Sequence, residues 1–188
     1  MKKIGLLLFL LMPLALLGQT KEESYNNAVT AFEAKDYQKA ITYFTRVIKS
    51  NYEPFLAVSY NYRGLSKKYL KNYTGAKNDF KKALEIEHES LYIHNNLANI
   101  YYIEEDYEMA IDHFSIALSF DPYNTTICTN LANSYFQLNM YNTARKYYQK
   151  ALDNDPSNAN AEFGIAEVDR MQNTYGQPAV MENEDIEN

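Results

Sequence analysis

Residues 96–117 read NLANIYYIEEDYEMAIDHFSIA, and residues 130–151, which lie 34 positions further along the chain, read NLANSYFQLNMYNTARKYYQKA. Both stretches begin with Asn-Leu-Ala-Asn and then place tyrosines, alanines and a further aromatic ring at matching positions. A unit of this length cannot bury its own apolar face, so neighbouring units must stack to form one core. The spacing therefore predicts a repeat architecture.

Fainter copies of the same pattern precede these two stretches, at a spacing of 34 to 36 residues. Small residues let two helix backbones approach, and each enclosed ring buries on the order of 150 to 250 Å². We therefore expect the shared columns to form the core of helix hairpins. The alanine column is Ala40, Ala76, Ala110 and Ala144, the aromatic column is Phe44, Phe80, Phe114 and Tyr148, and the tyrosine column is Tyr37, Tyr73, Tyr107 and Tyr141.

These columns resemble the tetratricopeptide repeat. The third and fourth units carry the pattern most fully and end at Pro122 and Pro156, whereas the second has Arg63 where leucine is usual. The resemblance covers roughly residues 24 to 173. It implies an all-α fold, a right-handed α-solenoid of stacked helix-turn-helix repeats with a C-terminal capping helix.

We expect one repeat domain over residues 20–173, with repeats at about 24–56, 57–90, 91–124 and 125–158 and a capping helix at 159–173. The last stretch is amphipathic, so it offers an apolar face to its neighbour and a polar face to water. Residues 174–188 are rich in acidic side chains, which predicts a disordered, solvated tail. A partner-binding role for this tail is the alternative.

The N-terminal residues 1–19 have the composition of a secretory signal peptide. Lys2 and Lys3 give a basic start, residues 4–17 are almost wholly apolar, and cleavage is expected near Gly18 or Gln19. The apolar run is shorter than the roughly 20 residues that span a bilayer, although an uncleaved short anchor stays open. We therefore expect an exported domain, periplasmic or extracellular, with no membrane span after cleavage.

The charge of the chain argues against nucleic acid as a partner. Removal of Lys2 and Lys3 with the leader leaves 16 basic against 24 acidic side chains, a net charge of about −8. Basic residues gather between Arg63 and Lys82, and neither Lys nor Arg occurs from Ala83 to Ala144. Solvated helix faces are the favoured explanation of this polarity, and the alternative is that it steers a partner or sets head-to-tail association.

The sequence offers no catalytic constellation, so we expect no enzyme activity, no cofactor and no metal. The three histidines, His88, His94 and His113, are scattered, and no two are spaced to share one helical face. There is no glycine-rich phosphate loop and no nucleophile elbow. Cys128, the single cysteine, lies within a predicted helix, and burial between repeats is its expected place.

In the family that the chain resembles, the first helix of each repeat lines a concave groove. Here those helices carry the two Asn-Leu-Ala-Asn copies, and an asparagine amide can match the backbone of an extended peptide with its donor and its acceptor. The alternative is that these amides bond neighbouring helices. The predicted peptide-binding residues are Tyr62, Tyr92, Asn95, Asn96, Asn99, Tyr102, Asn130 and Asn133.

The sequence therefore predicts a protein-protein interaction scaffold that binds a protein or extended peptide in its concave groove, within a bacterial cell-envelope assembly. The alternative is a structural subunit of an envelope complex that self-associates, as a homo-oligomer, through its end helices. Fold alone does not identify the partner.

Overall fold

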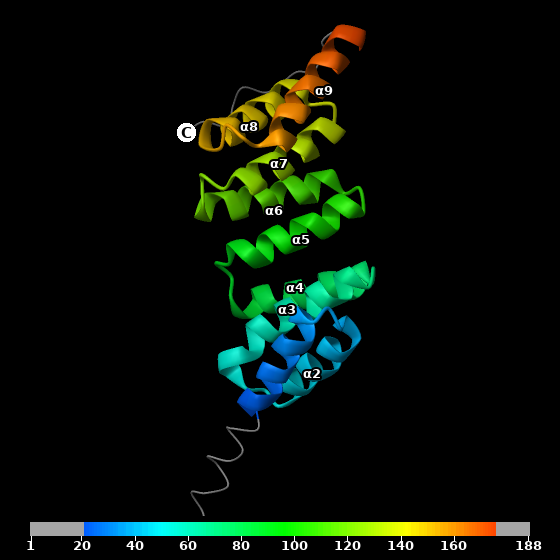
Figure 1. Cartoon of the computed structure of the whole chain (residues 1–188), viewed down its shortest axis with the longest axis vertical. Helices are drawn as coiled ribbons and strands as arrows, with labels where there is room; N and C mark the ends of the chain where they lie inside the picture. Colours follow the sequence, from blue (N-terminus) through cyan, green and yellow to red (C-terminus); the bar gives the residue numbers. More distant parts are fainter. Residues whose placement is uncertain (1–20, 176–188) are drawn as a thin grey trace, which may run out of the picture. The chain divides into compact units, whose positions relative to one another are not determined.

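The computed structural model describes residues 21–175, and all regular structure in that range is helical (Figure 1). The predicted leader lies outside the described residues, as does the predicted tail from residue 176 onward, whereas residues 174 and 175 end the last helix. A first helix over residues 21–33 precedes the others. The helices that follow it are α2 (Tyr37–Lys49), the short 3₁₀ helix η1 (Glu53–Phe55), α3 (Leu56–Tyr69), α4 (Tyr73–Ile86), α5 (Leu91–Ile103), α6 (Tyr107–Phe120), α7 (Thr125–Gln137), α8 (Tyr141–Asn154) and α9 (Ala159–Tyr175).

The chain divides after Glu89 into two compact units. Unit 1 contains the helices through α4, and unit 2 contains α5 to α9. In unit 1, α3 packs against α2 and α4. In unit 2, each helix from α5 to α9 packs against the next, and α9 also contacts α7 (Figure 1). The predicted all-α repeat fold of helix hairpins is confirmed within each unit.

The turn inside each hairpin follows one local rule. Five residues before each alanine of the alanine column, the backbone takes a left-handed conformation with φ of 60° to 62°, at Lys35, Lys71, Glu105 and Asn139. The next residue then caps the second helix in three of the four hairpins. Asp36, Asn72 and Asp106 accept a hydrogen bond from the backbone amide three residues on, whereas Met140 has no oxygen to offer.

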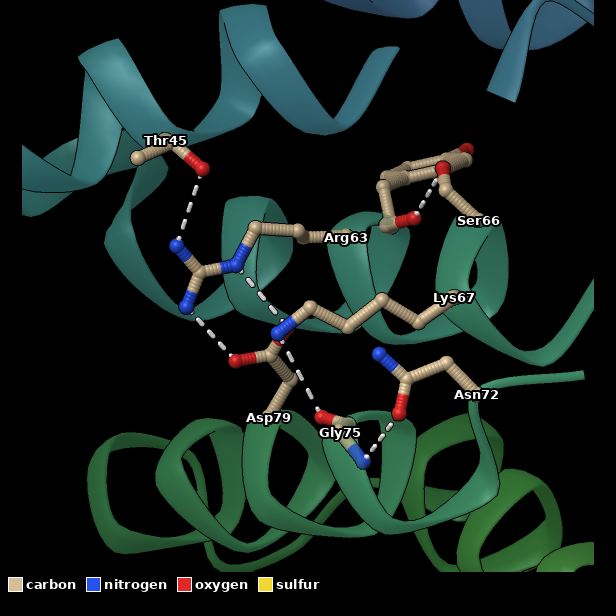
Figure 2. Close-up of polar contacts among 8 residues, drawn as sticks. Thr45, Arg63, Ser66, Lys67, Asn72, Gly75 and Asp79 are labelled. Atoms are coloured by element: carbon tan, nitrogen blue, oxygen red, sulfur yellow. Dashed lines mark hydrogen bonds and ion pairs between the residues drawn. The ribbon is translucent and has the colours of Figure 1, made fainter. Parts of the chain in front are cut away.

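The core of unit 1 combines rings with one buried ionic network. Phe44 and Phe80 are fully enclosed, and a Cβ on Gly64 of α3 would lie 2.7 Å from the Phe80 ring. Beside them, the Asp79 carboxylate accepts two hydrogen bonds from Arg63, at 2.6 and 2.8 Å, and pairs with the Lys67 ammonium at 2.7 Å (Figure 2). The Arg63 guanidinium also donates to Thr45 Oγ1 of α2 at 3.1 Å, so the network joins α2, α3 and α4.

Unit 2 has an apolar core at the corresponding positions. Leu97, Leu131 and Phe114 are fully buried, and Tyr148 is 2% exposed. The helix α9 closes this core, because Gly164 lies so close to the Tyr148 ring that a Cβ there would collide with it. Arg145 of α8 also donates to Asp169 and Gln172 of α9. The predicted burial of Cys128 is confirmed, at 0% exposure.

Candidate functional site

The predicted groove residues fall on three helices. Tyr62 belongs to α3 in unit 1, and the other seven belong to α5 and α7 in unit 2. The Tyr62 ring packs into the core of unit 1, stacked on Phe44 at 5.6 Å between centroids and edge-on to Phe32 at 5.0 Å. The Tyr62 ring is therefore part of the core, and the other predicted peptide-binding residues all lie in unit 2.

Asn99 and Asn133, the last residues of the two Asn-Leu-Ala-Asn copies, are engaged inside the protein. The Tyr148 hydroxyl of α8 donates to Asn133 Oδ1 at 2.6 Å, as the helix-bonding alternative foresaw. Burial raises the pKa of Tyr148 to about 12, so the phenol keeps its proton at neutral pH. In the α5–α6 hairpin the aromatic column holds Phe114 of α6, which has no hydroxyl. Asn99 of α5 instead donates to the backbone oxygen of Asn95 at 2.7 Å.

The other α5 candidates differ in exposure. Tyr92 is 74% exposed, and Tyr102 is half-buried against the Tyr107 ring at 5.4 Å. Asn96 is half-buried, and it interacts with another residue of the protein. The Oδ1 atom of Asn95 is buried without a hydrogen-bond partner among the described residues, which leaves an acceptor unsatisfied on this helix.

Asn130 lies in an open polar hollow between α7 and the start of α9. The hollow has a volume of about 320 Å³ and involves the α8–α9 loop as well as both helices. The Asn130 side chain makes no hydrogen bond within residues 21–175, so both its donor and its acceptor stay available. The polar side chains that line the hollow are Thr125, Thr126, Thr129, Asn130, Asp155, Asn158 and Asn160.

Internal hydrogen bonds fix the positions of the loop residues that line the hollow. Asn158 caps α9 through the amide of Ala161 at 3.1 Å and donates to Thr129 Oγ1 at 3.3 Å, which ties the loop to α7. The Ser157 hydroxyl and amide donate to Asp155, and these bonds lower the pKa of its carboxyl, which is therefore ionised at neutral pH. Asp155 is the single charged side chain among the lining residues.

The residues predicted from the sequence include Asn130 but not the other polar residues that line the hollow. Asp155 directly precedes Pro156, and Asn158 and Asn160 follow it, in a short polar run that has the composition of a linker to the capping helix. Thr126 lies in the first turn of α7. The signal in the sequence that could have indicated them is the density of polar residues in this loop, because residues 155–160 include three Asp or Asn side chains.

Sequence reasoning also missed a contact between two histidines. The prediction treated the histidines as scattered, since spacing along one helix does not report contacts between helices. The structure brings His94 of α5 and His113 of α6 together, with Nδ1 to Nδ1 at 3.0 Å. Within residues 21–175, no group of three or more His, Cys, Asp or Glu side chains could hold a metal ion.

Two further observations concern the helices and the single cysteine within residues 21–175. In the part of the chain that the structure describes, none of the helices combines the length and the apolar character needed to cross a bilayer. Burial raises the pKa of the Cys128 thiol, which keeps it protonated and a poor nucleophile.

Family models described as "Tetratricopeptide repeat" match four segments that together make up more than half of the chain. One model matches residues 92–124 and 126–158, and two further models match residues 25–51 and 57–88. No curated protein matches the sequence significantly.

Several solved structures share the fold. A tetratricopeptide repeat protein from Parabacteroides merdae aligns with 85% of this chain at a TM-score of 0.78 and 19% identity, and the chain spans 62% of that structure. The MamA protein aligns with 87% of this chain, over 99% of its own length, at a TM-score of 0.73 and 16% identity. The first such domain of Spaghetti (RPAP3), solved with the HSP90 peptide SRMEEVD, aligns with 62% of this chain and 93% of its own length, at a TM-score of 0.60 and 17% identity.

Proposed function

This chain belongs to the tetratricopeptide repeat family, and we propose that its repeats form an interaction scaffold whose partner segment binds in the hollow between α7 and α9. The observation that carries the proposal is the unengaged Asn130 amide, which lies among hydroxyl and amide side chains in a hollow of about 320 Å³. Such groups suit the main chain of an extended peptide, because they offer donors and acceptors together.

The charge of the hollow limits the class of partner. Asp155 is its single charged lining residue, and no Lys or Arg lies among the lining residues. A neutral or basic segment therefore fits better than an acidic one. This separates the proposed site from the Spaghetti domain, whose peptide SRMEEVD carries two glutamates and an aspartate.

We test this by selecting extended peptides from a random library against the chain without residues 1–19. The dissociation constants of the selected peptides are then measured for the parent and for the double variant Asn130→Ala, Asn160→Ala. We expect at least a tenfold weaker affinity in the double variant, because it removes two lining amides. Asn78→Ala, at an exposed position on α4 in unit 1, is the matched control and should bind as the parent does. Equal affinities for parent and double variant would contradict the proposal.

Self-association is the second candidate function, and the observation that favours it is the exposed apolar ring on the terminal helix. Phe163 of α9 is 67% exposed. Sedimentation of the parent and of Phe163→Ser across a hundredfold range of concentration tests it. A mass that rises with concentration only in the parent supports self-association through α9, and a constant monomer mass in both removes this candidate.

Export into a bacterial cell envelope completes the proposal, and it rests on the signal-peptide composition of residues 1–19. Cell fractionation followed by N-terminal sequencing of the recovered protein tests it. A mature N-terminus near Gly18 or Gln19 in an envelope fraction is the expected result, and an intact Met1 in the cytoplasmic fraction would overturn it.

A further inference from the structure

The hollow between α7 and α9 contains a carboxylate with one oxygen that lacks a partner. The Ser157 amide and hydroxyl both donate to Asp155 Oδ1, at 3.0 and 2.6 Å. Asp155 Oδ2 makes no hydrogen bond or ion pair within residues 21–175. Because the bonds from Ser157 lower the pKa of the Asp155 carboxyl, this group is ionised at neutral pH. The hollow therefore holds a negative charge with a free acceptor.

The preceding repeat shows why this oxygen is free. The sequence Asp-Pro-x-Asn that begins at Asp155 also begins at Asp121, 34 residues earlier. There, Asn124 Nδ2 donates to Asp121 Oδ2 at 3.0 Å, so the aspartate is bound within its own loop. In the later copy, Asn158 Nδ2 instead donates to Thr129 Oγ1 of α7 at 3.3 Å. The change of acceptor for one asparagine amide leaves Asp155 with the free oxygen that Asp121 lacks.

The cations of the helices around the hollow do not pair with Asp155. Helix α7 carries no charged side chain. Arg145 of α8 and Arg170 of α9 both pair with acidic side chains of α9. Lys146 is exposed on α8, and Lys150 lines a separate hollow that α6 also lines. A positive charge for Asp155 is therefore not supplied by α7, α8 or α9.

The acceptors of the hollow favour a primary ammonium as the ligand. Thr126, Asn130 and Asn160 line the hollow, and their side chains make no hydrogen bond within residues 21–175. An ammonium has three donors and no acceptor, so it can bind Asp155 Oδ2 and two of these oxygens together. A guanidinium binds a carboxylate best through two parallel hydrogen bonds. That mode needs both carboxylate oxygens, and Asp155 Oδ1 already accepts two bonds from Ser157.

We propose that Asp155 binds the ammonium of a lysine side chain in the partner segment, and that the free oxygens of Thr126, Asn130 and Asn160 supply its other acceptors. The inference rests on the proposed function, because it names the side chain that the partner presents to the same hollow. Each asparagine amide keeps its NH₂ group for a peptide carbonyl. The lysine contact is therefore compatible with binding of the main chain.

The test is a selection of N-acetylated, C-amidated random peptides against the protein, followed by dissociation constants at low and high salt. We expect the selected peptides to share one lysine. Asp155→Asn keeps an oxygen for Ser157 but removes the charge, so it should weaken binding by about tenfold or more and reduce the salt dependence. Replacing the shared lysine by norleucine should weaken binding to the parent equally and cause no further loss in Asp155→Asn. Asp121→Asn is the matched control and should bind as the parent does.

The outcomes separate this inference from the proposed function. Selected peptides without a shared lysine, or equal affinities for the parent and Asp155→Asn, would overturn the lysine contact. If Asn130→Ala, Asn160→Ala still weakens binding in that case, the proposed function stands alone, and if it does not, both fail. Peptides in which arginine replaces the lysine without loss would overturn the choice of an ammonium. Binders recovered only from a parallel library with free N-termini would overturn the lysine in favour of the terminal amine.

Discussion

The hairpin α3–α4 of unit 1 and the hairpin α7–α8 of unit 2 place different chemistry at the same three columns of the repeat. The first has Arg63, Lys67 and Asp79, and 68 residues later the second has Leu131, Tyr135 and Tyr147. In the first, an ionic network joins the helices (Figure 2). In the second, the two tyrosines stack at 5.5 Å beside a fully buried leucine.

The comparison shows that the same helix hairpin can place its polar side chains either inside the core or at the surface. In α3 the charged side chains turn inward and satisfy each other, which fixes the pairing of α2, α3 and α4 without leaving Arg63 or Asp79 for a partner. In α7 the matching columns hold Leu131 and Tyr135, and Thr126 and Asn130 of the same helix line a hollow. The register that packs the repeat is shared by both hairpins, and the polar groups left outside the core of α7 line the proposed binding surface.

The largest expected effect comes from removing the carboxylate of the ionic network. Asp79→Leu leaves Arg63 and Lys67 unpaired in a mostly buried site, and we expect a loss of about 3 to 5 kcal/mol in the free energy of unfolding. Denaturant unfolding measures it. Tyr147→Leu, at the matching column, should cost only about 1 kcal/mol, since it loses one ring contact. Equal costs would show that the ionic network has no special role.

The reverse exchange sharpens the comparison. The triple variant Arg63→Leu, Lys67→Tyr, Asp79→Tyr transfers the residues of hairpin α7–α8 into hairpin α3–α4. Replacing a buried ionic cluster by packed apolar residues is often neutral or stabilising by about 1 to 4 kcal/mol, and we expect a gain within that range. The denaturation midpoint is the readout. A loss of several kcal/mol would mean that the backbone of unit 1 is shaped around its ions.

Much of this comparison could be predicted from the sequence, and the rest could not. The columns predicted the helices and their order, because Ala76, Ala110 and Ala144 recur at the length of one helix-turn-helix unit. Arg63 was recognised as a departure from the pattern, yet its partner Asp79 lies 16 residues away on the other helix of the hairpin. The histidine pair and the hollow depend in the same way on contacts between segments, which periodicity does not encode.

The hairpins also differ in how closely the backbone of the first helix approaches the second helix. Gly64→Ala would bring a Cβ within 2.7 Å of the Phe80 ring, and we expect a loss of about 1 to 3 kcal/mol from the overpacking. At the matching column α7 already has Ala132, where Ala132→Gly should cost about 0.5 to 1 kcal/mol through backbone entropy. Thermal unfolding of both variants compares them. A stabilised Gly64→Ala variant would show that Phe80 moves aside freely.

The smallest expected effect concerns the helix caps. Asn72 accepts from the Gly75 amide at 2.9 Å at the start of α4, whereas Met140, in a similar backbone conformation, leaves α8 without a side-chain cap. Met140→Asp should therefore stabilise the chain by about 0.5 to 1 kcal/mol, and Asn72→Ala should destabilise it by a similar amount. Urea midpoints for the two single variants are the measurement. We expect the urea midpoint to rise in Met140→Asp and to fall in Asn72→Ala. A shift in the same direction in both variants would contradict the role given to the helix caps.

The central claim, that a partner segment binds in the hollow between α7 and α9, is tested most directly by site-specific photo-crosslinking. A benzophenone amino acid is placed at position 160, which lines the hollow, or at position 146, which is exposed on α8, and each protein is irradiated with the selected peptides. We predict crosslinked peptide from position 160 and none from position 146. Crosslinking from position 146 alone would contradict the claim and move the binding surface to the opposite helices.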